Sequence, residues 1–169
     1  MPHNAIRYQR LRPEMNTSSL LALYRRSIAS VDDRLYSPSQ RHAWAQWATD
    51  PASADAQLRR GLTIMALVDG SAVGFAQLYP ADLVNMLYVD DGWQKRGIGT
   101  TLVTQLETIA RRQGVATLAT RASDASLPLF QRLGFMPAQR EQVVAGNGVT
   151  LMRTLMRKPQ IWNITTDDP

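Results

Sequence analysis

The chain of 169 residues contains no cysteine, and this absence excludes several kinds of protein. Without thiols there can be no disulfide framework, no zinc-thiolate site and no cysteine nucleophile. The only two histidines, His3 and His42, lie far apart in the sequence, so we predict no metal site. The chemistry of the protein must therefore rest on other side chains or on the backbone.

Long apolar runs are missing as well. No stretch of about 20 residues is apolar enough to span a membrane, and arginines interrupt the first thirty residues, which argues against a secretory signal. No repeat or linker divides the chain, so we expect one domain over residues 1–158 and a loose tail over 159–169. A cytoplasmic protein that does not bind membranes is the simplest expectation.

Acidic residues are outnumbered, with 14 Asp and Glu against 19 Lys and Arg, which gives a formal net charge of +5. All the basic residues except Lys95 and Lys158 are arginine, whose planar guanidinium favours phosphates and carboxylates. This composition suits a polyanionic ligand such as a nucleotide, a cofactor or a nucleic acid. Because the arginines are scattered, with no basic stripe interleaved with aromatic residues, nucleic acid is the weakest of these partners.

Hydrophobic periodicity and turn residues predict a mixed α/β domain. Asp69-Gly70 between two apolar runs is the strongest hairpin signal, because these residues tolerate the positive φ of a type I′ turn. Ser37 followed by Pro38 is typical of a helix start. The expected strands are 5–11, 62–68, 72–79, 83–89, 115–121, 135–144 and 149–157, and the expected helices are 14–30, one that begins at 38, one between Gly99 and Gly114, and 123–133.

The segment "VDDGWQKRGIGTTL" places glycines where a strand gives way to a helix. Gly92 and Gly97 have the spacing of a Walker A motif, but Ile98 and Gly99 stand where lysine and a hydroxyl residue are required. A dinucleotide-binding fingerprint needs a third glycine where Leu102 stands. Neither of these phosphate-binding motifs is therefore present.

What remains is Gln94-x-x-Gly97-x-Gly99 at the beginning of a helix. Two residues without Cβ allow successive backbone N–H groups to converge on an anion at the positive end of the helix. Lys95 and Arg96 add positive charge beside them. An ordinary helix-entry turn is the plainer interpretation, and the two cations favour anion binding over it.

This segment resembles the pyrophosphate-binding motif of the GNAT superfamily of N-acetyltransferases, Gln/Arg-x-x-Gly-x-Gly/Ala. The wider run over residues 85–103 looks like the family's strand, loop and helix, and "LFQRLGF" over 129–135 looks like its later helix and turn. The resemblance implies an α/β domain of mixed α+β type. Its central sheet would be mixed, mostly antiparallel and of about seven strands, with helices on its faces.

The family binds acetyl-coenzyme A without a metal, and the resemblance implies where it would bind here. The pyrophosphate would lie on Gln94, Lys95, Arg96, Gly97, Ile98, Gly99 and Thr100, and the pantetheine along Leu87, Tyr88 and Val89. An amide of that strand would polarise the thioester carbonyl, as in an oxyanion hole. An amine would then attack directly, with no acyl-enzyme.

The catalytic acid and base stay open. Many family members have a tyrosine in the later helix that protonates the leaving thiolate, but Phe130 stands at that place here and has no proton to give. Tyr36, Tyr88, Ser123 and water are the candidate acids. Asp82, just before the strand at 83–89, is the candidate base.

The loop between the first two helices lines the acceptor pocket in this family. Asp32 and Asp33 lie in that loop and could attract an amine cation, although loop carboxylates are more often simply solvated. Together with Tyr36 they are the candidate substrate-binding residues.

The sequence thus predicts an N-acetyltransferase that moves an acetyl group from acetyl-coenzyme A to the amine of a small molecule. Because the usual acid is missing, a coenzyme A-binding sensor without turnover is the main alternative, and a protein or peptide N-acetyltransferase is another. The acceptor, the acyl-chain preference and the oligomeric state stay open, a homodimer included.

Overall fold

The computed structural model describes residues 5–160 and contains one sheet of seven strands. The strands are β1 Arg7–Arg10, β2 Leu62–Val68, β3 Ser71–Leu78, β4 Leu83–Val89, β5 Thr117–Ser123, β6 Met136–Val144 and β7 Thr150–Pro159. Their order across the sheet is β1-β2-β3-β4-β5-β7-β6. Only β4 and β5 pair in parallel, and every other neighbouring pair is antiparallel. The sheet is therefore mixed and mostly antiparallel, as predicted.

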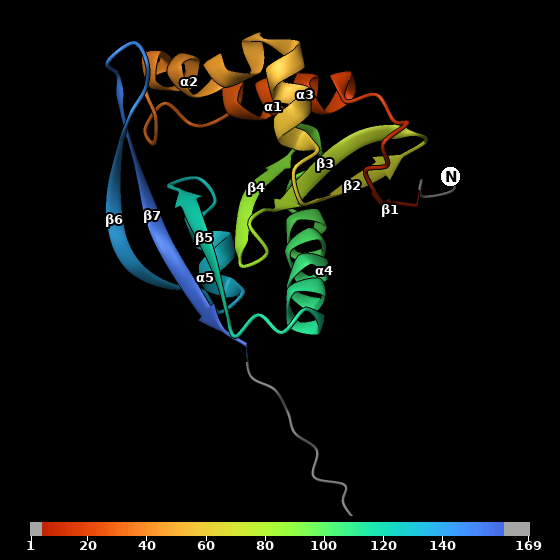
Figure 1. Cartoon of the computed structure of the whole chain (residues 1–169). Helices are drawn as coiled ribbons and strands as arrows, with labels where there is room; N and C mark the ends of the chain where they lie inside the picture. Colours follow the sequence, from red (N-terminus) through yellow and green to blue (C-terminus); the bar gives the residue numbers. More distant parts are fainter. Residues whose placement is uncertain (1–4, 161–169) are drawn as a thin grey trace, which may run out of the picture.

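Helices cover both faces of this sheet (Figure 1). They are α1 Ser18–Ala29, α2 Pro38–Ala45, α3 Pro51–Leu58, α4 Ile98–Arg112 and α5 Leu127–Arg132, with short 3-10 helices at Gln46–Thr49 and Asp91–Trp93. In Figure 1, α1, α2 and α3 lie above the central strands and α4 lies below them. α3 is not among the predicted helices, because its eight residues carry only a weak helical period of apolar side chains.

Local signals in the sequence decide several of these elements. Ser37 forms a full capping box with Gln40 at the start of α2. Asp69 and Gly70 have φ values of 49° and 80°, as a type I′ turn between β2 and β3 requires. Gly114, with φ of 81°, follows the end of α4, and its N–H donates to the carbonyl of Arg111. These three predictions are confirmed.

Several boundaries differ from the prediction. The first helix begins at Ser18 rather than at residue 14, β7 runs to Pro159 rather than to 157, and two further differences concern β5 and α5. The N–H of Val115 donates to Ala110 O at 3.0 Å, so this residue closes the C-terminus of α4 and β5 begins only at Thr117. The predicted helix over 123–133 is shorter than expected. Its first residues form a turn in which the N–H of Ser126 donates to Ser123 O at 3.1 Å, and α5 begins at Leu127.

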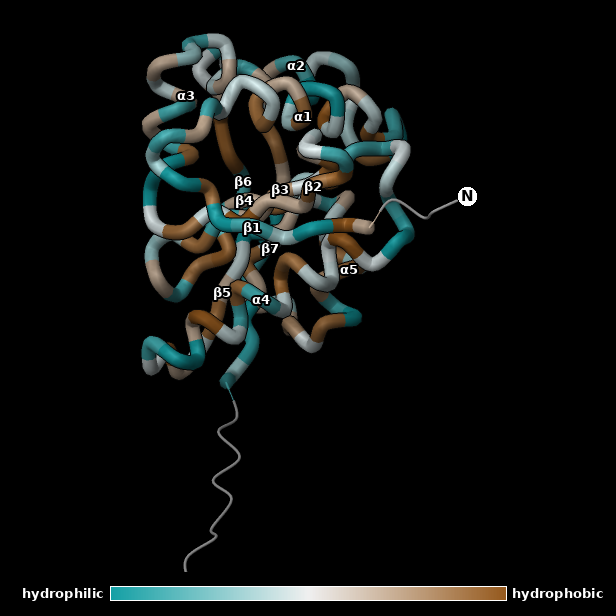
Figure 2. Tube along the Cα trace, turned by 90° about the vertical axis from the view of Figure 1, so that its right-hand side faces the viewer, coloured by the Kyte–Doolittle hydropathy of each residue, from teal (hydrophilic) through white to brown (hydrophobic). Residues whose placement is uncertain are grey.

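The core consists of two clusters, one on each face of the sheet. The first lies between the strands, α4 and α5, with Leu102, Leu106 and Phe130 among its buried members. The second lies under α1 and α3 and includes Leu23 and Phe75. Figure 2 shows the hydrophobic strands enclosed between the helices. Each large apolar side chain buried in this way contributes roughly 1.5–3 kcal/mol of stability.

The sheet opens between β4 and β5. These strands are paired at only two positions, Leu83 with Ala119 and Val84 with Thr120. Beyond them β4 stays paired with β3, although Asn85 is an extra residue opposite the step between Gln77 and Leu78, which makes a β-bulge. The C-terminal halves of β4 and β5 are therefore unpaired with each other, and a space opens between them.

The predicted tail over 159–169 begins inside the sheet. Pro159 is the last residue of β7, and the N–H of Gln160 donates to Ala116 O at 2.8 Å. The rest of that tail lies outside the described residues. Within residues 5–160, no helix has both the length and the apolar character to cross a bilayer.

Candidate active site

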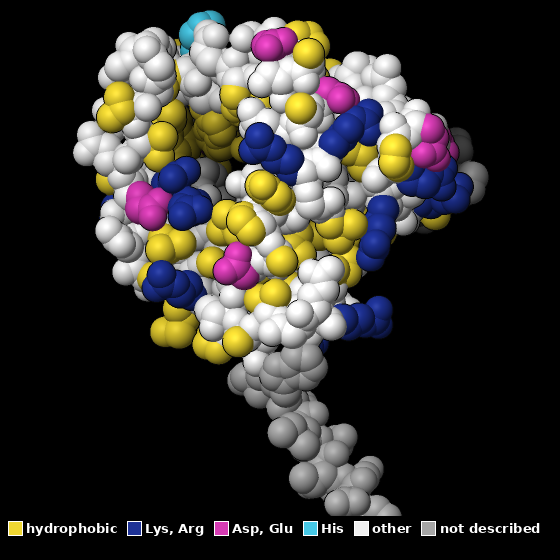
Figure 3. All heavy atoms as spheres, viewed as in Figure 1, with side chains coloured by type: hydrophobic (Ala, Val, Ile, Leu, Met, Phe, Trp, Pro, Cys, Tyr) yellow, Lys and Arg dark blue, Asp and Glu magenta, His cyan; other side chains and the backbone are white. Residues whose placement is uncertain are grey.

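A cleft of about 590 Å³ occupies the space between β4 and β5. One part of its wall comes from the start of α4 and from α5, on one side of the sheet. The other part comes from α1 and α2 on the other side, together with residues of the sheet strand β7. Figure 3 shows the surface deeply hollowed below α2. The opening in the sheet thus joins a glycine-rich helix start to a pocket on the opposite face.

The start of α4 is built to present backbone N–H groups. Gly97 caps the helix with φ of 79° and ψ of 8°, and Lys95 also has a positive φ of 61°. A non-glycine residue in this region costs roughly 1–2 kcal/mol, so the loop holds Lys95 there against its preference. The first N–H groups of a helix have no acceptor within the helix. Together with the positive end of the helix dipole they form an anion-binding concavity.

The two glycines of the motif have different roles. Gly97 provides the left-handed conformation that begins the helix. Gly99 allows α4 to pack closely against Leu129 of α5, because a Cβ at this position would lie 2.9 Å from Leu129 Cδ2. A larger residue at 99 would therefore displace the end of the Leu129 side chain at the cleft.

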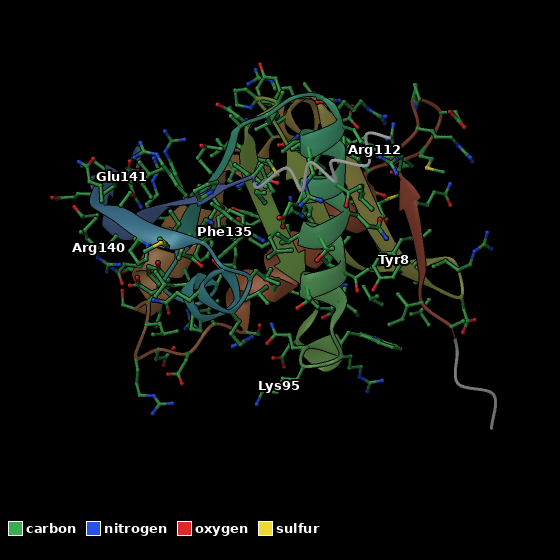
Figure 4. The ribbon with its side chains drawn as sticks, turned by 90° about the horizontal axis from the view of Figure 1, so that it is seen from below. Tyr8, Lys95, Arg112, Phe135, Arg140 and Glu141 are labelled. Atoms are coloured by element: carbon green, nitrogen blue, oxygen red, sulfur yellow. The ribbon has the colours of Figure 1, made fainter. Side chains whose placement is uncertain are left out.

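The predicted cofactor-binding side chains do not all face the cleft. Gln94, Lys95, Gly97, Ile98, Gly99 and Thr100 line it, as do Leu87, Tyr88 and Val89. Arg96 does not, because its guanidinium lies over the ring of Trp93, 4.6 Å from the ring centroid. This cation–π contact holds the loop rather than a ligand. In Figure 4, Lys95 projects outward beside the start of α4.

The unpaired edge of β4 offers backbone groups to the cleft. Val89 O accepts from Ser27 Oγ and Gln94 Nε2, both at 3.3 Å, so it does not bond β3. The next N–H, of Asp90, does bond β3, at Val73 O. Along an antiparallel strand, successive residues bond the neighbouring strand and point away from it in turn, so Leu87 has the same orientation as Val89. The N–H groups of both residues point away from β3, into the space between β4 and β5.

Tyr88 lines the cleft within an aromatic cluster. Its ring lies 4.7 Å from Tyr24 and 5.5 Å from Phe75, centroid to centroid. Burial raises the pKa of Tyr88 to about 12, so its hydroxyl keeps its proton at neutral pH.

Tyr36 also lines the cleft, but its hydroxyl is already engaged. It donates to Met152 O at 2.7 Å and accepts from the N–H of Asp124 at 2.8 Å. Burial raises the pKa of this tyrosine too. The hydroxyl therefore ties the loop before α2 to β7 and to the end of β5, and its proton is committed to a carbonyl.

Ser123 and Phe130 lie where β5 leads into α5. Both line the cleft. Ser123 Oγ is 3.1 Å from Ser126 Oγ and accepts from the N–H of Ser126. The Phe130 ring is only 2% exposed and packs edge-on against Phe135, 5.2 Å between centroids, so it belongs mainly to the core.

The three candidate carboxylates stand away from the cleft. Asp82 is exposed in the turn before β4, and its main-chain carbonyl accepts from the N–H of Ala119. Asp32 is exposed, and hydrogen bonds from Arg34 lower its pKa to about 2. Asp33 pairs with Arg41 at 2.6 Å. Because none of these aspartates lines the cleft, the structure does not bring the expected base or amine-binding carboxylates to the site.

Sequence reasoning missed three arginines that line the cleft: Arg132 at the end of α5, and a pair formed by Arg121 of β5 and Arg153 of β7. Glu141 of β6 binds both, with its Oε2 3.4 Å from Arg121 Nε and 3.0 Å from Arg153 Nε. Side chains alternate along β5, so Arg121 lies on the same face as Ser123. This alternation is the one feature of the sequence that could have indicated Arg121 as a site residue. The pairing of Ser123 with Arg153, and of Arg153 with Glu141, follows only from the register of the sheet.

Several solved structures are similar to this chain. A GCN5-related N-acetyltransferase from Rhodopseudomonas palustris is 34% identical, with a TM-score of 0.86, over 95% of this chain and 99% of that one. PaiA N-acetyltransferase from Thermoplasma acidophilum, in complex with coenzyme A, is 17% identical with a TM-score of 0.69, over 92% of this chain and 99% of that one. A phosphinothricin acetyltransferase from Sinorhizobium meliloti, in complex with acetyl-coenzyme A, is 18% identical with a TM-score of 0.60, over 91% of this chain and 88% of that one. The fold and site define an acyltransferase.

The family follows from the sequence match. Residues 33–156 match the model of the acetyltransferase (GNAT) domain, and no curated protein sequence matches the chain. The chain belongs to the GNAT family of acetyltransferases. The family and the fold class expected from the glycine motif are thereby confirmed. Within residues 5–160, no group of three or more His, Asp and Glu side chains could hold a metal ion.

Proposed function

We propose that this protein transfers an acetyl group from acetyl-coenzyme A to the amine of a small molecule by direct attack. The observation that carries the proposal is the continuous cleft between the diverging strands β4 and β5. It begins at an anion-binding helix start on one face of the sheet and ends in a pocket on the other face. Two substrates can therefore meet in the opening of the sheet.

The residues present fit coenzyme A. We assign the pyrophosphate to the N–H groups at the start of α4, with Lys95 adding charge, and the pantetheine to the free edge of β4. Coenzyme A and acetyl-coenzyme A are bound by PaiA N-acetyltransferase and by the phosphinothricin acetyltransferase, respectively. The thioester carbonyl would accept from the N–H of Leu87 or Val89, which stabilises the oxygen as negative charge develops on it.

In the transfer, the nitrogen of the amine forms a bond to the acetyl carbon, the carbon–sulfur bond breaks, and the amine gives up a proton. Water is the proposed acceptor of that proton, since no carboxylate from the described residues lines the cleft. Tyr88 and Ser123 line the cleft with protonated hydroxyls. They are the side chains proposed to donate a proton to the leaving thiolate of coenzyme A. A thiolate is a good leaving group, so this proton can follow bond cleavage.

Two hydrogen bonds favour a small acceptor over a protein. Tyr36 donates to Met152 O at 2.7 Å, and Gln40 Nε2 donates to Thr150 O at 3.0 Å. They tie α2 and the loop before it to β7 and so close one side of the acceptor pocket. An extended peptide needs a groove open at both ends, whereas a small amine does not.

The test measures coenzyme A binding by calorimetry and thiol release from acetyl-coenzyme A with a panel of primary amines. We expect binding, and turnover with at least one amine of low molecular mass. Coenzyme A binding without turnover on any small amine or peptide would contradict the enzyme and favour a sensor. Turnover on peptides alone would replace the small molecule by a protein acceptor.

A further inference from the structure

Building on the proposed amine acetylation, we propose that the acceptor carries a carboxylate beside its amine, and that Arg121 and Arg153 bind this carboxylate. The acceptor would then be an amino acid or a closely related amino carboxylate. Two observations support this proposal: every charged side chain that lines the cleft is a cation, and these two arginines share a single carboxylate, that of Glu141.

All the ionisable residues with full charge that line the cleft are cations. They fall into two groups. Lys95 precedes α4 and Arg132 ends α5, beside the proposed coenzyme A site, whereas Arg121 and Arg153 come from β5 and β7. No aspartate or glutamate among residues 5–160 joins them in the wall. A purely cationic acceptor such as a polyamine would meet repulsion here, while an anionic group would be attracted.

The two arginines are incompletely paired. Both approach the same carboxylate oxygen, Oε2 of Glu141, through Nε. Their terminal nitrogens make no hydrogen bond to any other side chain or carbonyl in the part of the chain that the structure describes. Two guanidiniums against one carboxylate leave a net local charge of +1. The side chains of Arg121 and Arg153 are 42% and 41% exposed, so their free N–H groups are accessible from the cleft.

A neighbouring pair shows what a complete structural ion pair looks like in this sheet. Arg140 precedes Glu141 on β6 (Figure 4) and binds Asp124 through both terminal nitrogens, with Nη2 3.0 Å from Oδ2. One cation meets one anion there, with the fork geometry that carboxylates favour. Glu141 instead holds two like charges close together, which costs energy unless a second anion arrives. A ligand carboxylate would complete the group.

The cleft has no carboxylate base of its own among the described residues, so water is the proposed acceptor of the amine's proton. Anchoring the carboxylate on Arg121 and Arg153 also fixes the direction of the amine, which increases the rate through orientation.

The turnover test uses amino acids, their carboxamides, O-phosphoethanolamine and spermidine as acceptors, because a phosphate could occupy the same two guanidiniums. We expect kcat/KM for the best amino acid to exceed that for its carboxamide by about tenfold or more, as for a site built to bind a polar group that the analogue lacks. Arg121→Gln and Arg153→Gln should each raise KM for the amino acid by about tenfold or more. KM for acetyl-coenzyme A and kcat/KM for the carboxamide should stay unchanged.

Arg157→Gln is the matched control. Arg157 lies on β7, four residues beyond Arg153 and on the same face, but it is exposed and does not line the cleft. It should behave like the wild type. The inference would be overturned if the best acceptor were a carboxamide, O-phosphoethanolamine or spermidine. It would also be overturned if the KM of the arginine variants for the amino acid were unchanged. Neither result would contradict acetyl transfer itself.

A binding test separates the inference from the proposed reaction. N-acetyl amino acids and their amides are titrated into the coenzyme A-saturated protein, and binding is followed by the fluorescence of Trp44, which lines the cleft, with Trp44→Phe to identify its signal. We expect the carboxylates to bind more tightly, and the preference to be lost in both arginine variants. Such binding without any turnover would sustain the carboxylate site and refute the acetyl transfer. Equal binding of acids and amides would refute the carboxylate site.

Discussion

The ring of Phe130 is 2% exposed and packs edge-on against Phe135, at the position where the family resemblance implied a tyrosine acid. We expect Phe130→Leu to reduce the free energy of unfolding by about 1–3 kcal/mol, because the smaller side chain leaves part of the site unfilled. Turnover per folded molecule should stay within about twofold, since no proton is lost. Denaturant unfolding and steady-state kinetics measure the two effects.

Phe135→Leu is the control for that substitution, because Phe135 has the same burial and does not line the cleft. A fall in kcat of about 10²-fold or more in Phe130→Leu but not in Phe135→Leu would give the ring a role in the reaction.

Tyr88 gives the stability a dependence on alkaline pH. Burial raises its pKa to about 12 in the folded protein, against about 10 in an unfolded chain. Above pH 10 the unfolded state releases this proton and the folded state keeps it. The stability that the neutral hydroxyl contributes is therefore complete below pH 10 and is lost as the pH rises toward 12.

Denaturant unfolding between pH 9 and 12 tests this dependence. The midpoint should fall less steeply in Tyr88→Phe than in the wild type. Identical slopes in the two proteins would show that the Tyr88 hydroxyl titrates normally.

At the scale of an element, the start of α4 is the part that most directly defines the proposed coenzyme A site. We expect Gly99→Glu to weaken coenzyme A binding by at least about tenfold in calorimetric titrations. The carboxylate would repel the pyrophosphate, and its Cβ would approach Leu129 Cδ2 to 2.9 Å. The fold should persist, since an acidic residue in the first turn complements the helix dipole.

Gly92→Glu is the matched control. Gly92 lies in the same connection and does not line the cleft, and a Cβ added there would meet no atom within 4 Å. The substitution places the same charge nearby without blocking the helix start. Equal losses of affinity in the two variants would show a general charge effect and would remove the pyrophosphate from the N–H groups of α4.

At the scale of the whole molecule, the net charge of +5 predicts only weak attraction to nucleic acid. Many of the arginines pair with acidic side chains of the protein, as Arg26 does with Asp90 and Arg59 does with Asp55. We expect duplex DNA binding at low salt that disappears near an ionic strength of about 0.15 M. Fluorescence anisotropy at several salt concentrations measures this. Tight, sequence-selective binding at that ionic strength would contradict the preference for a small anionic ligand.

The sequence by itself determined the parts of the fold that depend on neighbouring residues. A type I′ turn needs two residues that accept positive φ, and Asp69-Gly70 supplies them. A helix start needs a cap, and Ser37 with Gln40 supplies it. The glycine motif that places N–H groups at the start of α4 is equally local, so the family and this helix start were predictable.

Only the tertiary structure decided the acceptor side of the site. Arg121, Arg153 and Glu141 come from three strands, and they meet because of the register of β5, β7 and β6, which no local pattern specifies. Asp82, Asp32 and Asp33 are close in sequence to elements of the cleft, yet they point to solvent or pair with arginines. Which charges face the acceptor depends on contacts between residues far apart in the chain, and such contacts form only when the sheet is assembled.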